Sequence, residues 1–189
     1  DLTRTIPVEK RFSPLQKEAY KVVSDAFEYG VSLLRPGQLF RDIHLSVCGK
    51  LAEGLIGMGI LKGNPDDIVQ EGAHTLFFPC GLGHMMGLDV HDMEDLGEKY
   101  VGYTETLVQS REFGLKSLRL GRELEAGFVL TVEPGLYFNP WLADKRRAEQ
   151  KYLSFVNYEK LEAFRHFGGI RIEEDFLITP DGSRKLGKN

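Results

Sequence analysis

The sequence predicts an α+β fold, with helices early in the chain and strands later. Two segments in the first third, residues 15–34 and 40–56, carry apolar side chains at helical spacing. From residue 75 onward the apolar runs are short and are separated by glycine and proline, as is typical of strands. Because helices and strands are segregated along the chain, this fold is favoured over alternating βαβ units.

The elements of the first third are marked by their boundary residues. Residues 1–8 alternate polar and apolar side chains, which predicts a first strand. Ser13 and Pro14 then supply a capping hydroxyl and a proline suited to the first helical position. The run 35–37, Arg-Pro-Gly, predicts the end of that helix. A second amphipathic helix is expected over 40–56.

The later part of the chain is expected to form the sheet. Its clearest strands are 128–132 and 169–179, with a charged, helix-compatible excursion over 144–165 between them. The full connection, 139–167, is longer than two neighbouring strands need. It is open to two interpretations, a solvated pair of surface helices or a lid or subunit contact.

Composition narrows the class of protein. The 189 residues suffice for one domain with a hydrophobic core, and the net charge of −4 argues against a nucleic-acid platform, which is usually basic. The apolar runs are too short to span a bilayer, so no membrane partner is expected. Two cysteines, Cys48 and Cys80, are too few for a disulfide framework and suit a reducing compartment, so a cytoplasmic location is predicted.

The segment 78–92 carries two histidines and two aspartates among three glycines. His84 and His91 are seven residues apart, so a continuous strand would place them on opposite faces. The glycines allow the chain to bend, which would bring both imidazoles to one cleft. Two histidines satisfied by ordinary hydrogen bonds in the core explain this segment equally well.

Two further segments carry single glutamates on strands. Glu133 ends an apolar, β-branched strand and precedes a Pro-Gly turn, which would suit a rigidly held metal ligand or a glutamate facing water. In 168–179, alternation places Arg171, Glu173 and Asp175 on one face. On that face, Glu173 is either a metal ligand with charged neighbours or one member of a row of charges exposed to solvent.

Together these side chains predict a metal site rich in oxygen ligands. A ligand set of Asp, His, Glu and Glu without cysteine is typical of a site for Mn²⁺, Co²⁺ or Zn²⁺ with open positions. A structural zinc site would normally contain cysteine. Two such ions sharing carboxylates would activate water and polarise a carbonyl, as peptide hydrolysis requires. Serine chemistry has less support because Gly-x-Ser-x-Gly is absent, and Cys80 near His84 matches no thiol-protease pattern.

The motifs resemble those of the pita-bread metallopeptidases, in the branch of aminopeptidase P and prolidase. They are G-L-G-H-x-x-G-L-D-V-H-D, T-V-E-P-G-L-Y and G-I-R-I-E-E-D, in that order, after an opening D-L-T-R-T-I-P-V. The resemblance covers essentially the whole chain. It implies a curved antiparallel sheet with helices on its outer face and a site for two divalent ions on the concave face. Mn²⁺ is the expected ion, with Co²⁺ and Zn²⁺ as alternatives.

The resemblance also implies a role for each site residue. The metal ligands would be Asp1, His84, Glu133 and Glu173, with Asp1 and Glu173 bridging both ions. Glu133 would also handle the proton of the attacking water. His91 would contact substrate and steady the reacting carbonyl.

Three more side chains match positions near the site. Arg171 and Tyr137 would support the reaction and the binding of substrate. Cys80 stands where many relatives carry histidine, and it either contacts substrate or fills a small buried space. The family's first aspartate ligand and N-terminal domain precede the position of Asp1. Residues 1–189 are therefore expected to be an incomplete catalytic domain that binds one ion or none and has little activity alone.

The implied function is hydrolysis of the Xaa-Pro bond at the N-terminus of peptides or dipeptides with proline at the second position. Longer peptides and dipeptides both remain open as substrates, and so does assembly into a homo-oligomer. The main alternative is a non-catalytic peptide- or protein-binding module of the same fold. Retention of His84, Glu133, Glu173 and His91 favours the enzyme, and also argues against metal-free hydrolysis of a small amidine on this scaffold.

Overall fold

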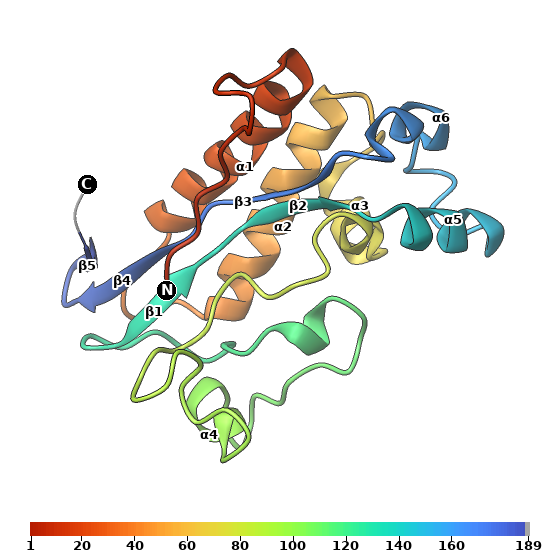
Figure 1. Cartoon of the computed structure of the whole chain (residues 1–189). Coiled ribbons are helices and arrows are strands. Elements are labelled where there is room, and N and C mark those ends of the chain that lie inside the picture. Colours follow the sequence, from red (N-terminus) through yellow and green to blue (C-terminus); the bar gives the residue numbers. More distant parts are fainter. Residues whose placement is uncertain (188–189) are drawn as a thin grey trace.

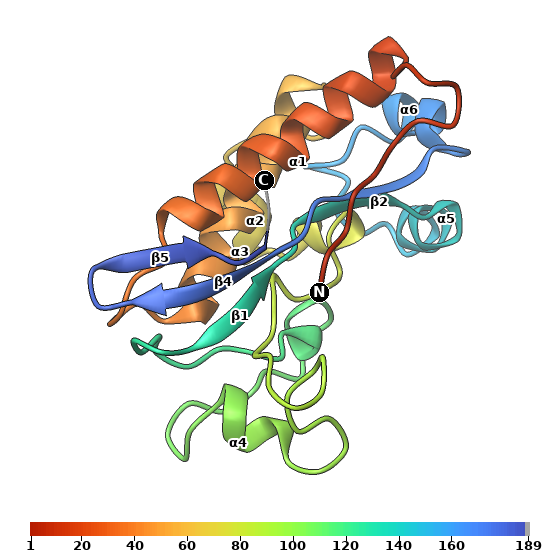
Figure 2. The ribbon, with the colours of Figure 1, turned by 60° about the vertical axis from the view of Figure 1, so that its left-hand side comes forward.

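The structure, a computed structural model, describes residues 1–187. Two long helices, α1 (Pro14–Ser32) and α2 (Phe40–Gly57), pack against each other and cover one side of the strands (Figure 1). The segment that carries the short helix α4 (Glu98–Gly102) lies on the other side (Figure 2). No helix among residues 1–187 has both the length and the apolar character that crossing a bilayer requires.

The boundaries of the two long helices follow the capping residues of the sequence. Ser13 accepts a hydrogen bond from the backbone N–H of Gln16, whose side chain in turn accepts one from the N–H of Ser13. Pro14 occupies the first helical position, where its missing N–H costs nothing. Both helices predicted from periodicity are confirmed, with ends that differ by one or two residues.

Among residues 1–187, five strands form two adjoining antiparallel sheets, one of three strands and one of two. They are β1 (Val129–Val132), β2 (Gly135–Phe138), β3 (Gly168–Arg171), β4 (Glu174–Thr179) and β5 (Gly182–Lys185). The pairings are β1 with β4, β2 with β3, and β4 with β5. The prediction of strand 128–132 is confirmed to within one residue, whereas the predicted strand 169–179 is divided into β3 and β4.

The interruption falls at the two predicted glutamates. Val132 pairs with Glu174 and Gly135 pairs with Arg171, so the register continues across the break and sets Glu133 opposite Glu173. The ladder is broken because proline at position 134 has no N–H to donate. The pairs β1–β4 and β2–β3 therefore share one register but form two separate hydrogen-bonded ladders.

The predicted strand over residues 1–8 is wrong in extent. Only Thr3 forms a bridge, in which its N–H and carbonyl pair with those of Glu173. Two residues later, the Thr5 hydroxyl accepts from the backbone N–H of Arg171 at 3.2 Å and donates to its carbonyl at 3.0 Å. A side chain thus takes the place of the backbone groups that would extend the ladder.

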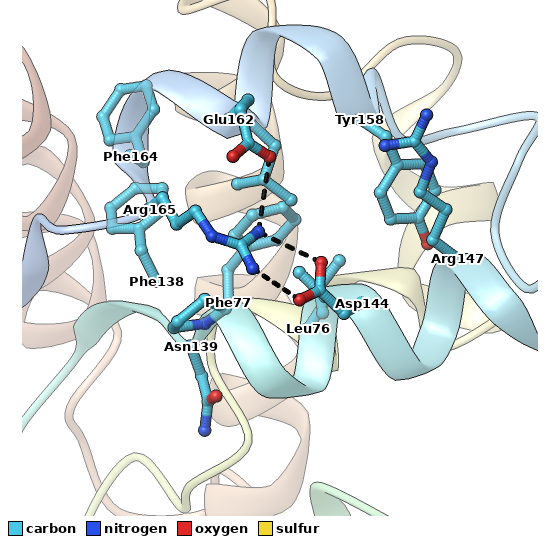
Figure 3. A pocket seen from close by; sticks show the side chains of 13 residues that line it. Leu76, Phe77, Phe138, Asn139, Asp144, Arg147, Tyr158, Glu162, Phe164 and Arg165 are labelled. Atoms are coloured by element: carbon cyan, nitrogen blue, oxygen red, sulfur yellow. Dashed lines mark hydrogen bonds and ion pairs between the residues drawn. The ribbon is translucent and has the colours of Figure 1, made fainter.

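The connection between β2 and β3 forms a small helical layer. It contains α5 (Pro140–Ala148), α6 (Tyr158–Leu161) and the 3₁₀ turn η3 (Glu162–Phe164). Arg165 holds the layer together by pairing with Asp144 at 2.7 Å and with Glu162, beside a pocket (Figure 3). The lining of this pocket contains none of the predicted site residues, so the described structure gives no support for a catalytic lid here.

The remaining short elements complete the chain. They are α3 (Pro65–Gln70) and the 3₁₀ turns η1 (Ala73–Leu76) and η2 (Leu115–Ser117). Within residues 1–187, one apolar cluster packs α1 and α2 against the helix-facing side of the strands. Its contacts include Phe27 of α1 against Phe176 of β4, with ring centroids 6.1 Å apart. The side chains on the opposite side of the strands are thereby left for the site.

Gly54 of α2 sets the closeness of the two long helices. A Cβ at this position would lie 2.3 Å from Cγ1 of Val22 in α1, whereas a Cβ at Gly49 of the same helix would have no atom within 4 Å. We expect Gly54→Ala to destabilise the fold by about 1–3 kcal/mol through overpacking. The matched variant Gly49→Ala should stabilise it by about 0.5–1 kcal/mol, because alanine favours a helix. Thermal unfolding followed by circular dichroism measures both, and equal effects would contradict this account of the contact.

Candidate metal centre

Four chain segments lie side by side and each carries one predicted ligand. The N-terminal segment pairs with β4 through Thr3 and Glu173, and β4 pairs with β1. On its other edge, β1 is flanked by residues 82–86, where the N–H of Thr131 donates to the carbonyl of His84 at 3.0 Å and that of Glu133 to Leu82 at 2.7 Å. The four segments therefore form an irregular sheet that is broader than the regular strands alone.

The register places the predicted ligands on one face. Glu133 and Glu173 are opposite each other, and Asp1 is two residues before Thr3, the partner of Glu173. His84 is opposite Thr131, which is two residues before Glu133. Because side chains alternate with a period of two, Asp1, Glu173, Glu133 and His84 all project to the same side.

The side-chain atoms converge within metal-binding reach. One ligand atom from each of Asp1, His84 and Glu173 lies within 4.8 Å of the others. Nε2 of His84 is 3.6 Å from Oδ2 of Asp1 and 3.5 Å from Oε1 of Glu133. Glu133 therefore lies beside His84, next to the group formed by Asp1, His84 and Glu173.

His84 is held in the tautomer that a metal ligand needs. Its Nδ1 lies 3.1 Å from the carbonyl oxygen of Met85, so Nδ1–H donates and Nε2 keeps its lone pair. That Nε2 is buried and has no hydrogen-bond partner among residues 1–187. Burial also lowers the pKa of His84, which favours the neutral imidazole. An unpartnered buried nitrogen directed between carboxylates is the donor that a cation would satisfy.

The acidic side chains lack enough positive charge to balance them. Glu173 is only 1% exposed, and burial together with the neighbouring Glu173 raises the pKa of Glu133 to about 7. The nearby guanidinium of Arg171 lies 3.3 Å from Glu133 and 3.7 Å from Glu173 and is partly exposed. Buried carboxylates of this kind are normally paired or bound to a metal. The residues present thus fit a divalent cation.

The same contacts decide between the two interpretations of the strand face over 171–175. Glu173 is buried, and its Oε2 accepts a hydrogen bond from the hydroxyl of Thr3. The interpretation of this face as a row of charges exposed to solvent is therefore wrong for Glu173. Glu174, which breaks the apolar pattern of the opposite face, is also buried and pairs with Arg4 and, at 2.9 Å, with Lys185.

His84 and His91 come together although they are an odd number of residues apart. Their ring centroids are 4.3 Å apart and their planes are nearly perpendicular at 85°. The chain folds back here, with the N–H of Asp92 donating to the carbonyl of Met85 at 3.0 Å. Gly87 permits this because a Cβ there would lie 2.2 Å from a carboxylate oxygen of Asp92.

The other predicted site residues lie around the glutamates. Tyr137 is partly buried, which raises its pKa to about 12, and its hydroxyl would be 2.7 Å from a Cβ at position 135, so glycine is required there. Cys80 is half-buried against the apolar core, and burial raises the pKa of its thiol, with Glu133 adding to the effect. These positions are compatible with the predicted supporting roles, and for Cys80 also with a small filler; the roles themselves remain predictions.

Two threonines at the site were missed in the sequence. The hydroxyl of Thr131 accepts from the N–H of His84 at 3.0 Å and donates to Oε1 of Glu133 at 3.2 Å, linking two candidate ligands. The hydroxyl of Thr3 donates to Oε2 of Glu173. Each is two residues from a predicted ligand, so the alternation of the strands carried a signal for both.

Comparisons with known proteins agree with this geometry. The model of metallopeptidase family M24 matches residues 1–180. The chain is 41% identical over 186 residues to an Xaa-Pro dipeptidase of Homo sapiens, covering 98% of this chain and 36% of that protein. It is 34% identical to a probable Xaa-Pro aminopeptidase of Sordaria macrospora, covering 98% of this chain and 38% of that protein. The chain thus spans little more than a third of the length of these relatives.

A solved structure shows the same fold. The zinc-substituted aminopeptidase P of Escherichia coli in complex with product matches with a TM-score of 0.70 and 37% identity, over 98% of this chain and 34% of that one. The predicted α+β pita-bread fold is confirmed by this likeness. With a family model that matches most of its length and motifs whose residues converge in space, the chain belongs to metallopeptidase family M24.

Proposed function

We propose that this chain is the catalytic part of a metal-dependent exopeptidase that hydrolyses the Xaa-Pro bond at the N-terminus of its substrate. The observation that carries the proposal is the convergence of Asp1, His84 and Glu173 within 4.8 Å, with Glu133 beside them. The Xaa-Pro dipeptidases and aminopeptidases among the similar proteins support the proline-directed substrate. A peptide with proline at its second position is the proposed partner.

Asp1, His84, Glu133 and Glu173 would hold the ions. Divalent cations bound there supply a polarised substrate carbonyl and a more acidic water. Mn²⁺ is the ion we propose, because three carboxylates and one imidazole form an oxygen-rich set. The reducing cytoplasm remains the proposed location, in accord with two cysteines that form no disulfide in the described structure.

The side chains around the ions have distinct proposed tasks. Glu133 takes a proton from the attacking water and returns it to the leaving amine, a task suited to a largely buried carboxylate beside the ions. Arg171 lies between the two glutamates and keeps their carboxylates in place. His91 contacts the substrate next to His84.

A matched pair of peptides tests this function. The intact protein with Mn²⁺ should cleave Ala-Pro-Phe after its first residue and should leave Ala-Ala-Phe largely uncut, with release of alanine as the measurement. Removal of the metal by a chelator should abolish cleavage, and added Mn²⁺ should restore it. Comparison with the dipeptide Ala-Pro then separates an aminopeptidase from a dipeptidase. Metal-saturated, folded protein that binds these peptides and cleaves none would instead indicate a binding module.

A further inference from the structure

Glu94 connects His91 to an anchored part of the fold. The Nδ1–H of His91 donates to Oε2 of Glu94 at 2.8 Å, and Oε1 of the same carboxylate pairs with Nη2 of Arg119 at 2.7 Å. Arg119 also pairs with Glu98. A carboxylate can only accept at this contact, so the contact places a proton on Nδ1 of His91 and leaves Nε2 as the nitrogen for the substrate.

The backbone of Arg119 is held in place by packing and hydrogen bonding of its neighbours. Its neighbours Leu118 and Leu120 are buried, and the carbonyl of Leu118 accepts from the hydroxyl of Tyr103 at 2.7 Å. Gly102 lies so close that a Cβ there would be 1.8 Å from the carbonyl oxygen of Arg119. The guanidinium therefore projects from a segment whose own position is set by packing.

The loop that carries His91 and Glu94 has a strained backbone that contacts from outside the loop must hold. Met93 and Asp95 have left-handed backbone angles, with φ of 59° and 60°. Side chains other than glycine adopt this conformation at a cost, and it persists where surrounding contacts hold it. Arg119 supplies such contacts at Glu94, between the two strained residues, and at Glu98, after them.

We propose that Glu94, clamped by Arg119, is a positioning residue that sets the ring orientation and tautomer of His91 beside His84. This inference rests on the proposed function for its catalytic meaning. An exposed ion pair contributes little to stability, and Glu94 is 42% exposed, so its effect falls on orientation more than on folding. Partners that orient imidazoles in metal sites typically affect activity by about 10–100-fold.

The test uses Glu94→Ala and Glu94→Gln in the intact protein. With Mn²⁺ and an Xaa-Pro peptide, we expect Glu94→Ala to lower kcat by about 10-fold or more, with a smaller change in KM. Glu94→Gln retains the volume and an oxygen acceptor and should recover part of that loss. The control Glu149→Ala removes a surface partner of Arg146 at 2.8 Å, away from the site, and should leave kcat unchanged. Circular dichroism verifies that each variant is folded.

A second readout does not depend on activity. ¹⁵N spectra of histidine-labelled, metal-free protein report which nitrogen of His91 carries the proton, with His91→Gln to assign the signal. The wild type should show Nδ1–H, and Glu94→Ala should shift His91 toward Nε2–H. An unchanged His91 signal in Glu94→Ala would overturn the proposal, even if kcat falls. If the wild type cleaves no Xaa-Pro peptide, the proposed function fails, while the spectra still decide whether Glu94 sets the tautomer.

Discussion

Replacing Glu133 by glutamine should lower kcat for Xaa-Pro cleavage by about 10²–10⁴-fold. Glutamine keeps the shape of the side chain, and its amide oxygen can still meet Thr131, which donates to Glu133 at 3.2 Å. It cannot accept and return a proton at neutral pH, which the carboxylate of Glu133 is proposed to do. The loss should therefore appear in kcat measured at saturating Mn²⁺, where a weaker metal affinity no longer limits the rate.

The control for this variant is Glu125→Gln. Glu125 pairs with Arg122 at 2.7 Å on the surface, outside the cluster, so its variant should retain wild-type turnover. Should Glu133→Gln retain turnover within about twofold of the wild type, Glu133 would have no part in proton transfer. The same measurement at a range of Mn²⁺ concentrations separates a ligand role from a role in proton transfer, because only the former is compensated by added metal.

Replacing Glu173 by glutamine should weaken metal binding by about 100-fold or more. Residues that only orient a metal ligand already cost about 10–100-fold when removed, and Glu173 is itself proposed to be a ligand. Its buried carboxylate would be replaced by a neutral amide among the remaining ligands, so the site would lose a charge that nothing nearby supplies. Calorimetric titration of the intact protein with Mn²⁺ measures the change.

Glu174 is a matched control in the adjacent position. Its carboxylate points to the opposite side of the strand, where it pairs with Arg4 and Lys185. Glu174→Gln should lower stability through loss of these contacts while leaving the affinity for Mn²⁺ within about twofold of wild type. Equal loss of affinity in the two variants would show that the effect arises from disturbance of β4 and would remove Glu173 from the ligand set.

Much of the fold was predictable because local patterns encode it. Ser13 and Pro14 begin α1 for reasons of capping and backbone geometry that operate within one turn. The apolar periodicity of α1 and α2 reports burial of one face, which the core confirms. The strand ending before Glu133 was equally visible from its apolar, β-branched run.

The candidate ligands were identified by motif, but their surroundings were not. The pattern around Glu173 was equally compatible with a water-facing strand, whereas the structure buries it and places Thr3, 170 residues away, against its carboxylate. The spacing of His84 and His91 predicted opposite faces or a bend, and the contact between Asp92 and Met85 decides for the bend. Glu94 is only three residues from His91, but its contact with Arg119 comes from a distant segment and was not visible in the local pattern.

The sequence alone determined the α+β class, the two long helices, the family motifs and the chemical character of the ligands. These properties depend on side-chain periodicity and on residue types within short stretches. Tertiary structure alone decided which segments lie side by side, where the first strand ends, which carboxylates are buried and which nitrogen of His84 keeps its lone pair. Those outcomes depend on register and packing between segments distant in the chain, where many arrangements share the same local pattern and only the folded contacts select one.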